Sequence, residues 1–147
     1  MLLLAVTLAG VREIYADTKT EVLGIKVAMK RDDARRQLQK IGRLEKEERK
    51  QQEIWTLTND RHYAYLIVAF DKENTKVRYF TARAREGGKR VRYSDVIDLK
   101  KARQVGTVNN YKYILTVQGH ENRPGYTITA RGSDPQYLTY FSIELLD

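Results

Sequence analysis

Few residues in this 147-residue chain could perform acid–base, nucleophilic or metal chemistry. The chain has no cysteine, which excludes thiol catalysis, cysteine-ligated zinc, iron–sulfur clusters and disulfides. His62 and His120, the two histidines, lie in predicted turns at equivalent positions of two similar stretches, and such positions need not be near each other. Gly87-Gly88 lacks the lysine and serine of a phosphate-binding loop.

The hydroxyl and carboxyl side chains that remain have structural explanations. Ser94 is a good N-cap for a helix, and Asp95 and Asp98 suit that helix's N-terminal turn. Ser142 falls within a predicted strand. The sequence therefore predicts a non-enzymatic protein that binds no cofactor and no metal.

An internal similarity organises the chain. Residues 65–84 align without a gap to residues 126–145, at an offset of about 61. The identical pairs are Tyr65/Tyr126, Ile67/Ile128, Ala69/Ala130, Tyr79/Tyr140 and Phe80/Phe141. This similarity predicts two tandem units, 22–86 and 90–147, although chance likeness between alternating strands is the alternative.

Each unit is predicted to be a helix followed by three strands. The first helix follows from the spacing of Ala34, Leu38 and Ile41, with Asp32 or Asp33 as its cap and a left-handed Gly42 after it. The second helix begins at Ser94, presents one apolar face and ends at Gly106; that face comprises Val96, Leu99, Ala102 and Val105. The predicted strands are 53–58, 63–71, 76–85, 111–118, 126–131 and 137–146.

The expected fold class is α+β, in which two tandem α-β-β-β units pack their helices on one face of antiparallel sheets. The charged segment 43–53 has three open interpretations: a continuation of the first helix, a mobile arm or an additional edge strand.

Alternation along the strands predicts a binding face. In the second unit, Ile128, Phe141 and their apolar neighbours must face the helix. If the residue numbers of paired residues in the first unit's hairpin sum to about 147, Ile67 faces Phe80 in the core. The opposite side of that hairpin is apolar as well. That surplus side needs the other unit, a second subunit or a target protein. Packing of this side within the molecule is the alternative. The candidates for protein binding are Trp55, Leu66, Val68, Phe70 and Tyr79, with Arg131 and Tyr140 on the corresponding side of the second unit.

The charge of +8, from 27 basic and 19 acidic residues, favours an acidic partner. Basic residues cluster at 35–36, 40–43, 83–92 and 100–103, and the chain has ten tyrosines. Stacking of bases beside a basic groove would suit nucleic acid or another polyanion. The alternative explanation, a solvated helix face and a basic linker, is preferred, so nucleic acid is not the expected partner.

The N-terminus resembles an export signal. The apolar run 2–11 is too short to span a bilayer but suits the hydrophobic region of a secretory signal, with cleavage after Ala16. Val11 stands where a bacterial lipoprotein would carry its lipidated cysteine, so no lipid anchor is expected. A periplasmic or secreted protein is therefore expected, and the family resemblance described next implies that it is bacterial. The alternative is an ordinary buried strand or helix.

A short pattern of residues at the two ends of the first helix and in the next strand supports a family resemblance. It consists of Ala28-Met29 before the first helix, Ile41-Gly42 at the helix end and Ile54-Trp55 in the next strand. The chain resembles the β-lactamase-inhibitor-protein-like superfamily, which includes tandem inhibitory proteins and the small lipoprotein of the outer-membrane assembly machinery. Arg43 replaces a proline often found there, and the lipobox cysteine is missing. The resemblance implies an exported, non-enzymatic, inhibitor-like or envelope-assembly-like module that binds a protein.

Overall fold

The computed structural model describes residues 19–147. The predicted export signal at 1–16, its cleavage site and the residue at the lipobox position lie outside the described residues. Among residues 19–147, no helix has the length and apolar character needed to cross a bilayer.

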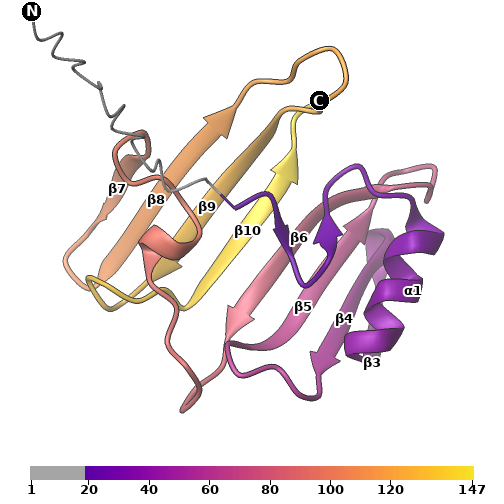
Figure 1. Cartoon of the computed structure of the whole chain (residues 1–147), viewed down its shortest axis with the longest axis horizontal. Coiled ribbons are helices and arrows are strands. Elements are labelled where there is room, and N and C mark those ends of the chain that lie inside the picture. Colours follow the sequence, from indigo (N-terminus) through magenta and orange to yellow (C-terminus); the bar gives the residue numbers. More distant parts are fainter. Residues whose placement is uncertain (1–18) are drawn as a thin grey trace, which may run out of the picture.

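One antiparallel sheet of eight strands dominates the structure (Figure 1). Across the sheet the strand order is β3-β4-β5-β6-β10-β9-β8-β7. The strands are β3 (Gly42–Glu48), β4 (Gln52–Leu57), β5 (Tyr63–Phe70), β6 (Val77–Ala84), β7 (Arg103–Thr107), β8 (Asn110–Val117), β9 (Tyr126–Gly132) and β10 (Tyr140–Leu145). Each half of the chain therefore supplies a meander of four neighbouring strands, and the halves meet where β6 pairs with β10.

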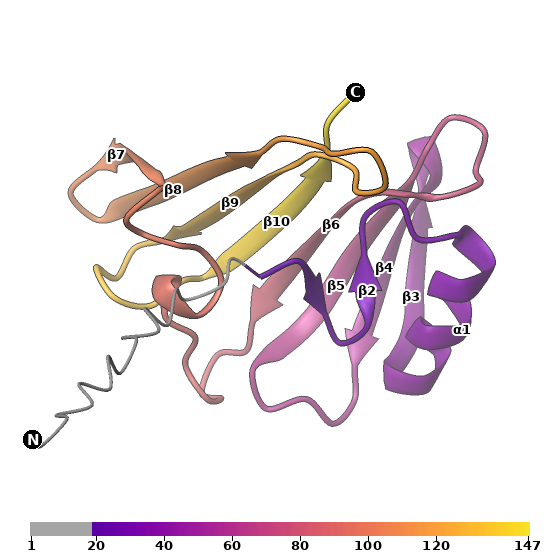
Figure 2. The ribbon, with the colours of Figure 1, turned by 45° about the horizontal axis from the view of Figure 1, so that its top comes forward.

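The remaining elements lie on one side of this sheet (Figures 1 and 2). They are the hairpin β1 (Glu21–Val22) and β2 (Ile25–Lys26), the helix α1 (Arg31–Ile41) and the short 3₁₀ turn η2 (Tyr93–Asp95). A second 3₁₀ turn, η1 (Arg49–Gln51), links β3 to β4. Buried residues of the hairpin, α1 and η2 form one core with the side chains beneath them, including Val22, Ile25, Leu38, Tyr93 and Phe141.

The predicted α+β class with two α-β-β-β units is wrong. The described chain is mostly β and contains one α-helix, and no second helix forms between Ser94 and Gly106. That segment instead contains η2 and then β7, which pairs with β8 through Val105 and Lys112. Val105, Gly106 and Thr107 are poor helix formers, and pairing at the edge of the sheet satisfies their backbone groups.

The first helix is confirmed, but its ends differ from the prediction. The N-cap is Lys30, with no capping side chain, so neither Asp32 nor Asp33 performs that role. Gly42 is extended, with φ −163°, and is not left-handed, because it begins β3 without an intervening turn. Of the three interpretations of segment 43–53, the additional edge strand is confirmed by β3.

The centre of the sheet has local two-fold character. Thr81 of β6 lies directly opposite Ser142 of β10, and their hydroxyl oxygens are hydrogen-bonded at 2.7 Å. These two residues also correspond at the offset of 61 that aligns the two halves of the sequence. The two equivalent strands therefore pair antiparallel around their own equivalent residues.

The predicted core side of the first half is confirmed for β6, where Phe80 is fully buried, and wrong for β5. Phe70 and Val77 pair as the predicted sum of 147 requires, but a bulge at Arg78 follows, and beyond it Val68 faces Phe80. Since side chains alternate along a strand, this one-residue slip places Leu66 and Val68 of β5 in the core in place of Ile67. In the second half, the predicted apolar side is confirmed, because Ile128, Phe141 and Ile143 are fully buried.

A buried tyrosine links η2 to the second half. The Tyr93 side chain is 1% exposed, its hydroxyl donates to the Asp134 carbonyl at 2.8 Å, and its ring lies 4.9 Å from that of Tyr113. Burial, followed by the influence of Tyr113, raises the pKa of Tyr93 to about 12. Burial likewise raises the pKa of Tyr63.

Alkaline pH should therefore destabilise the fold. The unfolded chain releases these phenolic protons near pH 10, whereas folded Tyr93 holds its proton to about pH 12. The unfolding free energy is then expected to fall as pH rises from about 10 to about 12, and to be insensitive to these groups below that window. Denaturant titrations at pH 9, 10 and 11 measure the slope. Tyr93→Phe should flatten it, and an unchanged slope in that variant would contradict the assignment.

Candidate binding surface

The structure separates the seven residues predicted to bind a protein. Four lie in the core beneath the hairpin and α1, and each is at most 3% exposed: Trp55, Leu66, Val68 and Phe70. Their predicted place on an accessible face is wrong, because the hairpin and α1 cover this side of the sheet, and the alternative of packing within the molecule is confirmed. Tyr79, Arg131 and Tyr140 are half-buried on the opposite side.

That opposite side, which we call the open face, has none of the described segments packed on it (Figure 2). It consists of the strand residues that alternate with the core positions. At its centre, five side chains from five successive strands form a cross-strand row: Tyr65, Arg83, Tyr140, Arg131 and Lys112. Each is directly opposite the next in the strand register, so strand spacing places neighbours about 5 Å apart.

The cations of the cross-strand row lack anionic partners within the described part of the chain. Arg131 donates from Nη1 to the Tyr140 hydroxyl at 3.2 Å, and its Nε is buried without a hydrogen-bond partner. Arg83 and Lys112 take part in none of the ion pairs among residues 19–147. The row is therefore a half-buried line of three positive charges and two phenol rings, open to a ligand.

The remaining open face is mixed in character. Around the row lie isoleucines, small hydroxyl residues and the half-buried Tyr79, whose hydroxyl is hydrogen-bonded to Gln52. Three carboxylates share this face: Glu144, 3.9 Å from Arg78 Nη2; Glu48, 3.3 Å from Lys46 Nζ; and Glu45, which accepts hydrogen bonds from Arg43 and Thr56. The positive charge is consequently concentrated along the row.

Elsewhere, several basic residues are already paired. On α1, Arg31, Arg35 and Arg36 each form an ion pair with a nearby carboxylate. In the linker, Arg90 pairs with Asp134 at 2.8 Å and stacks 3.6 Å from the centre of the Tyr137 ring. Local pairing thus reduces the attraction of the helix and linker clusters for a polyanion, compared with the cross-strand row.

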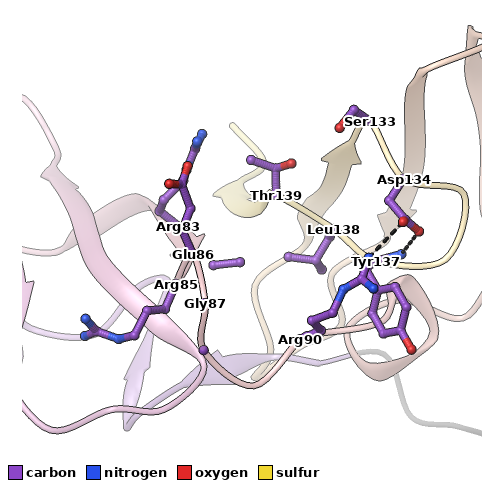
Figure 3. A pocket seen from close by; sticks show the side chains of 12 residues that line it. Arg83, Arg85, Glu86, Gly87, Arg90, Ser133, Asp134, Tyr137, Leu138 and Thr139 are labelled. Carbon is purple, nitrogen blue, oxygen red and sulfur yellow. Dashed lines mark hydrogen bonds and ion pairs between the residues drawn. The ribbon is translucent and has the colours of Figure 1, made fainter.

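A cleft of about 600 Å³ adjoins the row at Arg83, between the two halves (Figure 3). Residues 83–88 line one side, and the 133–139 connection lines the other. Arg83 belongs to both the row and the cleft. Arg85 points away from the cleft in Figure 3 and donates to the carbonyls of Leu57, Asp60 and Tyr63, so it is committed to the fold.

The residues examined for catalysis are dispersed. His62 is half-buried in the β4–β5 turn, and His120 is exposed in the β8–β9 loop. Ser94 is exposed in η2, while Ser142 is engaged with Thr81. Among residues 19–147, no group of three or more histidine, aspartate or glutamate side chains could hold a metal ion. Absence of catalysis stays a prediction.

Sequence reasoning missed Tyr65, Arg83 and Lys112 as members of one surface. Tyr65 was assigned to the core side, and Arg83 was grouped with the linker cluster. The predicted position of Arg131 and Tyr140 on the uncovered side of the second half was the available signal, because their sheet neighbours complete the row.

No protein-family model, curated protein sequence or solved structure matches this chain. The predicted resemblance to the β-lactamase-inhibitor-protein-like superfamily therefore stays a prediction.

Proposed function

We propose that this protein is a non-enzymatic binding module whose open face docks an acidic protein partner. The observation that carries the proposal is the cross-strand row, in which two tyrosines lie beside three cations that have no anionic partner among residues 19–147, on the open face of the sheet. Tyrosine and arginine are the residue types most enriched at the centres of protein interfaces. A half-buried cation without an anionic partner gains more electrostatic stabilisation from an incoming carboxylate than a cation that is already paired.

The composition of the open face favours a protein over nucleic acid. Nucleic-acid grooves combine a continuous positive track with stacking aromatics. Here the three cations are limited to one short line, and isoleucine and threonine side chains surround them, which suits a protein surface better than a long phosphate backbone. An export signal, still a prediction, would place such a module in the bacterial periplasm or outside the cell, in an inhibitor-like or assembly role.

Charge reversal within the row tests this function. The probe is a labelled dodecapeptide of alternating glutamate and threonine, compared with a twelve-nucleotide single strand. Arg83→Glu combined with Arg131→Glu is expected to weaken peptide binding by about tenfold or more, because two attractions become repulsions. Fluorescence anisotropy at low and moderate salt measures the affinity.

Lys26→Glu combined with Lys40→Glu is the control, since both lysines are exposed on the opposite side of the sheet and the total charge change is the same. Its affinity for the peptide should stay within about twofold of the parent, since a distant exposed charge is screened. Thermal unfolding verifies that each variant is folded. Equal losses in the row and control variants, or tighter binding of the single strand than of the peptide, would reject the proposal.

A further inference from the structure

The outer strand β7 is an unprotected sheet edge. It has one neighbour, β8, and all five of its residues are exposed. On the free side of such a strand, the N–H and C=O groups of alternate residues have no sheet partner, and they form a template for an added strand. β7 contains no proline, and the described part of the chain places no element beyond it.

The opposite edge differs in ways that discourage pairing. β3 carries a bulge between Leu44 and Lys46, and its outer half is a run of charged residues from Glu45 to Glu48. Bulges and charges are the devices with which sheets block their edges. The two equivalent outer strands are therefore not equivalent as docking sites.

Exposed apolar side chains gather at β7. Among residues 19–147, the large hydrophobic side chains that are exposed are Leu99, Val105 and Val108, at 41%, 40% and 80%. Val105 lies within β7, Val108 lies in the turn that follows, and Leu99 lies shortly before the strand. An added strand would cover part of this apolar surface.

The positive charge around β7 indicates which kind of strand would pair with this edge. The segment 99–119 contains no acidic residue and four cations, Lys100, Lys101, Arg103 and Lys112. A second copy of the chain, pairing β7 with β7, would bring two such segments together, and their like charges would oppose it. An extended acidic segment meets complementary charge instead. Val105 also pairs with Lys112, so the edge continues the cross-strand row.

We propose that β7 is a strand-addition edge, at which an extended acidic segment of the protein partner pairs with Arg103–Thr107. This inference rests on the proposed function and specifies how the partner docks. The added strand would direct its alternate acidic side chains to the open face, beside Arg103 and Val105, with Lys112 one strand further in and the rest of the partner over the cross-strand row. Main-chain hydrogen bonds would set its register, and the cations would select its sequence.

Backbone methylation of the probe tests strand addition with the full chain. Two further versions of the glutamate–threonine dodecapeptide carry N-methyl groups, one on every threonine and the other on every glutamate. An added strand uses the N–H groups of alternate residues, so one methylated peptide should lose about tenfold or more in affinity while the other keeps most of it. Hydrogen exchange should slow within residues 103–107 when the unmethylated peptide binds.

The outcomes separate the two proposals. If both methylated peptides bind as well as the parent and exchange at 103–107 is unchanged, strand addition is wrong while binding through the open face stands. If the unmethylated peptide does not bind, the proposed function is wrong and the inference fails with it. If 103–107 becomes protected as the protein alone is concentrated, and light scattering shows a dimer, a second copy occupies the edge and the acidic segment is rejected.

Discussion

Replacing Phe141 with alanine is expected to lower the free energy of unfolding by about 4 kcal/mol. Phe141 is fully buried where the two halves of the sheet meet. Its ring is 6.4 Å from that of Phe80 and 5.8 Å from that of Tyr63, both contributed by the first half. Truncation removes contacts on which both halves depend, in a domain whose total stability is typically about 5–15 kcal/mol.

Ser142→Ala is the matched control, because it changes the next residue of β10 on the opposite side of the sheet. It removes the hydroxyl partner of Thr81 and should cost about 1 kcal/mol. Denaturant unfolding followed by the fluorescence of Trp55, the one tryptophan in the sequence, gives both values. Costs that agree within 1 kcal/mol would contradict this account of the junction. Should the alanine variant fail to fold, Phe141→Leu is expected to cost about 1–2 kcal/mol.

The second large effect is expected at Glu53, the one buried charged residue among the described residues. Its carboxylate forms an ion pair with Arg35 of α1 and accepts a hydrogen bond from Trp55 Nε1 at 2.9 Å. Glu53→Leu leaves the guanidinium and the indole N–H without this partner. The expected cost is about 3 kcal/mol, because the buried indole N–H of Trp55 loses its acceptor and the half-buried Arg35 keeps only the exposed Glu47.

Glu47→Leu is the control for this prediction. Glu47 binds the same Arg35 at 3.2 Å, but its side chain is 63% exposed, so its loss should cost no more than about 1 kcal/mol. Adding Arg35→Met to Glu53→Leu should recover part of the loss, since the half-buried guanidinium is then removed together with its buried partner. Denaturant unfolding of Glu53→Leu, Arg35→Met and the double variant measures the coupling, with Glu47→Leu as the control. Additive costs, with no recovery in the double variant, would show that the pair does not fasten α1 to the sheet.

Local patterns predicted most elements of this fold. The spacing of Ala34, Leu38 and Ile41 identified α1, and the six strands predicted from β-branched and aromatic runs all form, with small differences at their ends. The prediction of a second helix was wrong. Val96, Leu99 and Ala102 have helical spacing, but the residues that follow them pair with β8 as strand β7. The missed signal was Asn109-Asn110, since Asn109 adopts φ +64° in the turn that reverses the chain into β8.

The candidate site was harder to predict, because it depends on register. Phe70 and Val77 pair as expected, but the single extra residue Arg78 moves Trp55, Leu66 and Val68 into the core. The residue types around Arg78 do not predict a bulge. The row itself joins strands that are distant in the sequence, such as β5 and β8, so its members could be collected only once the order of the sheet was known.

The meeting of β6 and β10 also has a consequence for how the chain folds. Within each half, neighbouring strands follow one another closely, so their pairing closes short loops. The junction instead pairs Thr81 with Ser142, which are 61 residues apart, and such distant pairing forms slowly. Until this junction forms, β6 is an unpaired edge of the first meander, and β10 of a neighbouring molecule can pair with it in the same register. When newly made chains are concentrated, the product that competes with the monomer is therefore an exchanged dimer, in which the first half of each molecule pairs with the second half of the other.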